Sequence, residues 1–200
     1  MMTVTEIKLR GERAKVTFGD GTAVESTKQI ASRLKCGEEL TDGEYASFCA
    51  ESSHACARLR AVELISRRDM SRAELRRKLI ERGSPEADAG RAVDWLVSLG
   101  YVSDERYAGL IVRHYASKGY GAARIRTELS RRGVPRELWG EALEGLGDTS
   151  AAADAFLRRR LRSGYDEKTV KRATDAMCRR GFSWEEIRAA LERVRAELEE

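Results

Sequence analysis

The chain has 200 residues, of which 42% are hydrophobic, 35% charged and 6% aromatic. No apolar run approaches the roughly 20 residues of a membrane helix, which excludes an integral helical membrane protein. The four cysteines lack paired C-x-x-C spacing, and no secretion signal precedes residue 30. We therefore expect a soluble, cytoplasmic protein with reduced thiols.

The net charge is only +4, but it is unevenly distributed. Residues 1–56 carry 7 basic and 9 acidic side chains, whereas residues 158–180 carry 9 basic and 3 acidic ones. The last twenty residues are acidic again, with 3 basic and 6 acidic side chains. The concentrated positive charge near the carboxyl end is a candidate for contact with an acidic or phosphate-bearing partner.

The amino end has a β pattern. Residues 4–9 and 14–18 are rich in β-branched side chains, and Gly19-Asp20-Gly21 before residues 22–24 is a hairpin signal. We expect a small antiparallel hairpin or three-stranded meander over residues 3–27. Such a hairpin is marginal alone and needs packing or a partner.

Helices follow the hairpin. Thr41 and Glu44 have capping-box spacing, which predicts a helix over about 44–52 and a second over 53–67. Further start signals predict the later helices, and they lie at Ser71, Ser84-Pro85, Ser103-Asp104, Pro135, Asp148 or Thr149, and Ser183. Gly100, Gly147 and Gly164 mark predicted helix ends.

A repeat underlies these helices. An arginine and a glycine end a helical run three times, at Arg82-Gly83, Arg132-Gly133 and Arg180-Gly181, with the glycines 50 and 48 residues apart. Apolar residues recur four and eight positions before each glycine and ten and thirteen after it. Four positions before the glycines lie Leu79, Leu129 and Met177, and eight before lie Leu75, Ile125 and Ala173. Ten positions after lie Val93, Leu143 and Leu191, and thirteen after lie Leu96, Leu146 and Val194. Such a period predicts stacked copies of one helical unit.

The predicted fold is mainly α, with three tandem three-helix repeats in an elongated, curved array and a small N-terminal β-hairpin or meander. The predicted segments are 1–52 for the hairpin and leading helix, and 53–102, 103–147 and 148–200 for the repeats. Trp95, Trp139 and Trp184 lie in the third helix of each repeat, where we favour a core role over recognition.

Motifs for catalysis are missing from the sequence. It has neither a phosphate-binding G-x-x-x-x-G-K-[ST] nor a complete dinucleotide motif. His54 with Cys49 and Cys56 would place its ligands on different helix faces, and His114 has no nucleophile partner. We expect no catalytic residue, no metal and no cofactor, and hence no enzymatic activity.

The basic residues are the candidate binding site. At 100° per residue, Lys168, Lys171, Arg172, Asp175 and Arg179 share one sector of a helix whose opposite side holds Val170, Ala173 and Met177. The candidate residues for contact with a partner protein or DNA phosphates are Arg158, Arg159, Arg160, Arg162, Lys168, Lys171, Arg172, Arg179, Arg76, Arg77 and Arg131. Stabilisation of helix C-termini is the alternative for the arginines before each glycine.

An ordered set of motifs resembles the RecX regulatory protein family over about residues 54–198. The motifs are Ser71-Arg-Ala-Glu-Leu75, Arg77-Lys-Leu79, Arg82-Gly83, Leu99-Gly-Tyr-Val102, Asp104-Glu-Arg-Tyr-Ala108, Gly119-Tyr-Gly121, Arg124-Ile125, Glu128-Leu129, Arg132-Gly133 and Arg179-Arg-Gly-Phe-Ser183. Each motif is weak alone, but their order is specific. Residues 1–50 match less well.

The resemblance implies three tandem three-helix repeats that bind the bacterial recombinase RecA and lodge in the groove of its filament on DNA. We expect the protein to be a monomer. The resemblance further implies inhibition of ATP hydrolysis, strand exchange and filament growth. Weak DNA binding is our additional expectation. The family motifs do not fix which basic residues touch RecA. A stand-alone helix-turn-helix-like DNA-binding protein and a scaffold for another protein are the alternatives.

Overall fold

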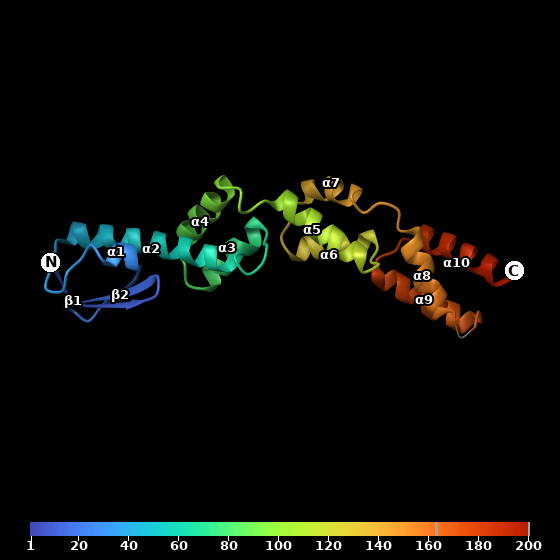
Figure 1. Ribbon diagram of the computed structural model, residues 1–200, viewed down its shortest axis with the longest axis horizontal. Coiled ribbons are helices and arrows are strands. Elements are labelled where there is room, and N and C mark those ends of the chain that lie inside the picture. The colour runs from blue at the N-terminus through green and yellow to red at the C-terminus, as the bar shows by residue number, and fades with distance from the viewer. Residues whose placement is uncertain (163, 200) are drawn as a thin grey trace. The chain divides into compact units, whose positions relative to one another are not determined.

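The computed structural model describes residues 1–162 and 164–199. It separates into two units, Met1–Val102 and Ser103–Glu200, and helices dominate both (Figure 1). The first unit holds the small sheet and the first three-helix repeat, and the second unit holds the other two repeats. The predicted mainly α fold with an amino-terminal β element is confirmed. The finer division at residues 52, 102 and 147 stays a prediction.

Four antiparallel strands form the amino-terminal sheet in the order β3-β2-β1-β4. They are β1 (Met2–Arg10), β2 (Arg13–Phe18), β3 (Ala23–Thr27) and β4 (Glu39–Leu40). The predicted meander is therefore confirmed, and the two-residue β4 is an addition to it. Val16 and Phe18 on β2 are almost fully buried, and their cluster includes residues of α1 (Lys28–Ala31) and α2 (Asp42–Ile65).

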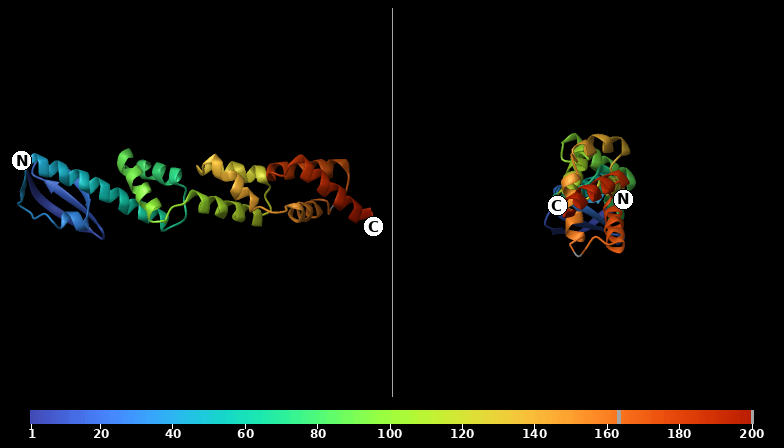
Figure 2. Two further views of the ribbon diagram at one scale, coloured as in Figure 1. Left: turned by 90° about the horizontal axis from the view of Figure 1, so that it is seen from above. Right: turned by 90° about the vertical axis from the view of Figure 1, so that its right-hand side faces the viewer.

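One continuous helix, α2, replaces the two helices predicted over 44–52 and 53–67. Thr41 caps it in the predicted reciprocal capping box with Glu44. The predicted break is wrong because the hydroxyls there bond to distant partners instead of capping a helix. Ser52 lies 2.8 Å from the hydroxyl of Ser26 on β3, and Ser53 donates to Asp88 at 2.5 Å. In Figures 1 and 2 the first part of α2 lies along the sheet, while its second part continues to the first repeat.

The first repeat packs the second half of α2 against α3 (Arg72–Glu81) and α4 (Glu86–Ser98). Its core comprises Ala57, Ala61, Leu75, Leu79 and their neighbours, which are buried together. Ser71 caps α3 as predicted, because its hydroxyl accepts the N–H of Glu74 at 3.0 Å.

Two more repeats make up the second unit. The second repeat contains α5 (Asp104–Ser117), α6 (Ala122–Arg131), a 3-10 turn (Arg136–Leu138) and α7 (Trp139–Glu144). The third contains α8 (Ser150–Arg160), α9 (Glu167–Arg180) and α10 (Trp184–Glu199). The single helix expected from Pro135 to Gly147 is thus split and shorter. Helix α8 ends at Arg160, earlier than the predicted stop at Gly164.

The predicted repeat is confirmed at its three glycine turns. Gly83, Gly133 and Gly181 have φ of 82°, 69° and 86°, a region that side chains resist. The residue that follows each glycine donates its N–H to the carbonyl of the buried residue that lies four positions before the glycine, as in a Schellman motif. These bonds run from Ser84 to Leu79 at 3.0 Å, from Val134 to Leu129 at 3.0 Å, and from Phe182 to Met177 at 3.3 Å.

The recurring apolar residues before each glycine are buried as predicted, whereas Leu143, Leu146 and Leu191 after the glycines are only partly buried beside their cores. Leu75, Leu79, Ile125, Leu129 and Met177 are completely buried. The tryptophans differ from one another. Trp95 and Trp139 are half-buried beside their repeat cores, whereas Trp184 is 59% exposed at the start of α10. The core role predicted for Trp184 is therefore wrong.

Candidate partner-binding surface

Helix α9 has one buried and one basic face. Ala173, Ala176 and Met177 are buried against α8 and α10. The predicted basic sector points the other way, and its members are exposed: Lys168, Lys171, Arg172, Asp175 and Arg179. Because the apolar face fixes the helix in its repeat, the sequence alone determines which way these cations project.

Both ends of α9 are well defined. The Asp166 carboxylate accepts the N–H of Thr169 at 3.0 Å and its hydroxyl at 2.7 Å. These bonds lower the pKa of Asp166 below its usual value, because they favour the charged carboxylate. Gly181 closes the other end in the left-handed conformation. The basic face therefore sits on a helix capped at both ends.

Most of the candidate cations in the third repeat lack a neutralising partner. Among the side chains that the structure describes, no carboxylate lies within 4.0 Å of these cations, which are Arg159, Arg160, Arg162, Lys168, Lys171, Arg172 and Arg179. We call this set the α8–α9 basic surface. Uncompensated charge of one sign attracts phosphates or carboxylates of a partner.

Aromatic contacts hold part of this surface in place. The guanidiniums of Arg159, Arg160 and Arg180 lie 5.8, 5.4 and 4.6 Å from the ring of Phe156. Phe156 is only 6% exposed, so three cations gather around one fixed ring. Cation–π contacts of this kind contribute about 0.5–1 kcal/mol each at exposed sites, and they restrict where the guanidiniums lie.

Arg158 belongs to a different group, because it is neutralised within the chain. Its guanidinium forms a fork with Glu197 on α10, at 2.7 and 2.6 Å. Arg193 on α10 forms a similar fork with Asp154 on α8, at 2.9 and 2.8 Å. Hydrogen bonding to Glu197 raises the pKa of Arg158 further. These two forks join α8 to α10.

The candidates of the earlier repeats are also paired. Arg76 lies 2.8 Å from Glu86, and Arg77 lies 3.4 Å from Glu81. Arg131 donates to Glu128 at 2.8 Å, which fits the helix-end role that the sequence left open. Among the residues that the structure describes, the candidates without a carboxylate within 4.0 Å all belong to the third repeat.

Glu128 is the centre of a buried network that the sequence did not reveal. It is 4% exposed and accepts bonds from Tyr115 at 2.7 Å and Arg131 at 2.8 Å. The hydrogen bond from Arg131 is the largest cause that lowers the pKa of Glu128 to about 2. Arg132 donates to the Tyr107 hydroxyl at 2.8 Å, so both arginines before Gly133 stabilise the second repeat.

Repeats two and three meet through their glycines, which we call the glycine clasp. The N–H of Gly121 donates to the Arg180 carbonyl at 2.9 Å, and Ala123 donates to Gly181 at 3.1 Å. Arg180 itself donates to the carbonyls of Lys118 and Gly119 at 3.0 and 3.1 Å. The sequence marked these glycines only as helix punctuation, because the contact joins residues about sixty positions apart.

Two absences concern the part of the chain that the structure describes. Each described helix is too short or too polar to span a membrane. Residues 1–162 and 164–199 also contain no group of three or more His, Cys, Asp or Glu placed to hold a metal ion. All four cysteines are free thiols.

Comparison with known proteins identifies the family. Residues 57–96 match the model of the first three-helix domain of RecX, and residues 103–143 match that of the second. The regulatory protein RecX of Xanthomonas axonopodis pv. citri is 40% identical over 134 residues, which cover 66% of this chain and 83% of the relative. The chain belongs to the RecX family. The RecX of Chromohalobacter salexigens is 38% identical over 133 residues, covering 66% of this chain and 88% of the relative.

Solved structures of RecX proteins share this fold. One crystal structure of regulatory protein RecX aligns over 98% of this chain and 100% of its own, with a TM-score of 0.69 at 20% identity. The RecX structure from Lactobacillus salivarius aligns over 72% of this chain and 97% of its own, with a TM-score of 0.62 at 18% identity. The first alignment covers almost the entire chain, including the amino-terminal sheet region.

Proposed function

We propose that this chain is a noncatalytic regulator that binds the recombinase RecA and its filament on DNA. Binding restrains the recombinase by inhibiting ATP hydrolysis, strand exchange and filament growth. The protein acts as a monomer in the cytoplasm, where its partner works. Membership of a family of regulatory proteins supports this role, as do the RecX motifs in repeats one to three.

The α8–α9 basic surface is the observation that carries the binding proposal. Four of its seven cations lie on α9, which is capped at both ends, and none of the seven has a described carboxylate within 4.0 Å. A partner with acidic side chains or phosphates would neutralise them without breaking internal ion pairs. The paired candidates Arg76, Arg77, Arg131 and Arg158 would have to give up an internal partner first, so we assign them a smaller share of the binding.

The test is an ATPase titration of RecA on single-stranded DNA with the full chain. The variant Lys168→Ala/Lys171→Ala/Arg172→Ala/Arg179→Ala removes four cations of the surface. An exposed ion pair contributes about 0.5 kcal/mol, so four lost contacts amount to about 2 kcal/mol. We expect about thirtyfold weaker inhibition, with helicity unchanged.

The matched control removes the same charge from elsewhere in the second unit. Arg113→Ala/Lys118→Ala/Arg126→Ala/Arg188→Ala takes four exposed cations from α5, α6, α10 and the residue after α5. It should inhibit nearly as well as the unaltered chain. Equal inhibition by both variants would remove the surface from the proposal, and no inhibition by the unaltered chain at excess would refute the function.

A stand-alone DNA-binding protein is the second candidate, because the same unneutralised cations would also attract phosphates. It predicts tight binding to DNA without RecA at physiological salt, with a steep salt dependence. Under that alternative, RecA ATPase would fall only in proportion to the DNA that the chain occupies. Inhibition at concentrations far below DNA saturation favours direct binding to RecA.

A further inference from the structure

The amino-terminal sheet carries a second basic cluster, which the sequence pattern did not single out. On the antiparallel β1–β2 pair, Lys8 lies opposite Lys15 and Arg10 lies opposite Arg13. Residues directly opposite each other, and residues two apart on one strand, project from the same face of a sheet. The four cations therefore share one face, and we call them the basic ladder.

The other face of the same strands is apolar. Ile7 lies opposite Val16, and Leu9 lies opposite Ala14. Val16 and Ala14 are buried in the core below the sheet and Ile7 packs against it, whereas Leu9 is 54% exposed. Hydrophobic burial therefore fixes the strand faces and their register. The basic ladder therefore stays on the face that carries no core residue, and at the hairpin end its Arg13 reaches Glu63 on α2.

Within the ladder, like charges stand opposite each other in two successive pairs, which destabilises a sheet. Neighbouring carboxylates offset only part of this repulsion. Lys8 pairs with Glu6 at 2.9 Å, and Arg13 pairs with Glu63 at 2.6 Å. Among the described side chains, no carboxylate lies within 4.0 Å of the charged nitrogens of Arg10 or Lys15.

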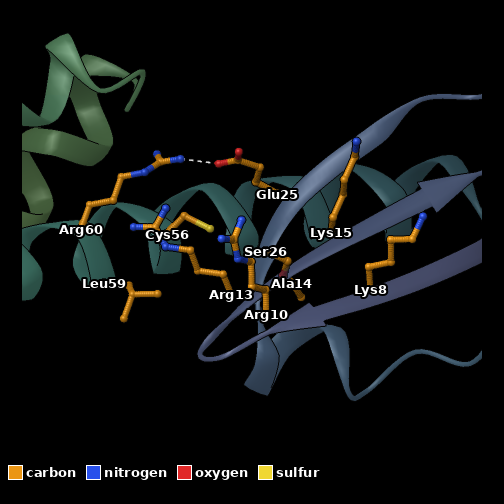
Figure 3. A pocket seen from close by; sticks show the side chains of 10 residues that line it. All are labelled: Lys8, Arg10, Arg13, Ala14, Lys15, Glu25, Ser26, Cys56, Leu59 and Arg60. Carbon is orange, nitrogen blue, oxygen red and sulfur yellow. Dashed lines mark hydrogen bonds and ion pairs between the residues drawn. The ribbon is translucent and has the colours of Figure 1, made fainter.

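The cross-strand carboxylate opposite Lys15 is engaged elsewhere. Glu25 on β3 lies directly opposite Lys15, but its carboxylate forms an ion pair with Arg60 on α2 (Figure 3). Arg10 and Lys15 are therefore available to an external anion. A sheet face that only needed solubility would alternate the signs of its charges.

A groove accompanies the ladder. A cavity of about 340 Å³ lies between the hairpin and α2, with the ladder and Arg60 among its lining residues (Figure 3). Its remaining lining includes Ala14, Cys56 and Leu59. The cavity thus combines several cations with apolar side chains of the hairpin and α2, and its volume suits a group of nucleotide size.

We propose that the basic ladder binds the phosphate backbone of single-stranded nucleic acid. Cations two residues apart on a strand are spaced about 7 Å, so the ladder presents regularly placed charges to a chain of phosphates. Positively charged grooves that follow the backbone are the usual means of holding single strands.

The test measures binding of the full chain to a fluorescein-labelled oligothymidylate of about 20 nucleotides by anisotropy. No recombinase is present, so the result is independent of the proposed RecA function. The variant is Arg10→Ala/Lys15→Ala, which removes the two ladder cations that have no described carboxylate within 4.0 Å. Its control is Lys28→Ala/Lys35→Ala, which removes two exposed cations from the same unit outside the ladder.

The salt dependence gives a quantitative expectation. Each phosphate contact on a single strand contributes about 0.7 to the slope of log K against log salt. The ladder variant should therefore show a slope shallower by about 1.4 between about 50 and 300 mM NaCl, whereas the control keeps the slope of the unaltered chain. The charge-preserving variant Arg10→Lys/Lys15→Arg should also keep it.

Two results would overturn the proposal. One is an unchanged slope in Arg10→Ala/Lys15→Ala with the far-UV circular dichroism of the folded chain. The other is displacement of the oligonucleotide by polyglutamate at equal charge concentration, which would assign the ladder to an acidic protein surface.

Discussion

The glycine clasp between repeats two and three leads to a sharp mutational prediction. A Cβ added at Gly121 would lie 2.3 Å from the carbonyl oxygen of Gly181 and 2.6 Å from the N of Phe182. These are backbone atoms, so no side chain can rotate away. The substitution Gly121→Ala should therefore separate helices α6 and α9 at this point.

The cost follows from the bonds that the separation breaks. Two backbone hydrogen bonds join Gly121 and Ala123 to the third repeat, and two more run from the Arg180 guanidinium to carbonyls of the second. At about 1 kcal/mol net for each bond, the clasp contributes about 4 kcal/mol. Each repeat keeps its own buried cluster, so we expect undocking and not global unfolding.

Hydrogen exchange measures this directly. The amide of Ala123 should exchange up to about a thousandfold faster in Gly121→Ala, which is the factor that corresponds to about 4 kcal/mol. Amides in the middle of α5 and α9 should keep most of their protection. Gly140→Ala in α7 is the matched control, since an added Cβ there has no atom within 4 Å. Unchanged exchange at Ala123 in Gly121→Ala would show that the clasp does not join the repeats.

Two further predictions concern the second repeat. The pKa of Glu128 is about 2 in the folded chain against a usual 4.5. The ionised carboxylate therefore stabilises the fold fully above about pH 4.5. This contribution of up to about 3 kcal/mol is lost as the pH falls from 4.5 through 2. Denaturant unfolding at several pH values should show a smaller loss of the free energy of unfolding between pH 4.5 and 2 in Glu128→Gln than in the unaltered chain. An equal loss in both proteins would contradict the role of the Glu128 network. Gly133→Val should lower the free energy of unfolding by about 1–2 kcal/mol or more, because φ is 69° there; unaltered thermal stability would remove this explanation of the turn.

Local patterns predicted the repeat architecture well. The capping boxes at Thr41 and Ser183 need only residues three positions apart, and both form. Burial of the apolar residues four and eight positions before each glycine follows from helical periodicity, which the sequence displays directly. Exposure of the basic face of α9 follows from the same periodicity, because burial of Met177 and its neighbours turns the opposite side to solvent.

Long-range partners explain what the sequence could not predict. Helix α2 continues through Ser52 because its hydroxyl bonds to Ser26, which is 26 positions earlier. Arg158 is removed from the set of uncompensated cations by Glu197, which is 39 positions later. The basic ladder depends on the register of β1 and β2, which a bulge between Val4 and Glu6 shifts. Neither composition nor spacing contains these pairings.

Helix α2 belongs to two hydrophobic cores at once. Phe48 lies in the core below the sheet, and Ala61 lies in the core of the first repeat. Because one continuous helix packs in both cores, a ligand that tilts the sheet also shifts α2 against the first repeat. We therefore expect a fragment that begins at residue 53 to lose part of this shared helix. A chimera made with a relative would have to exchange the amino-terminal sheet, α2 and the first repeat together.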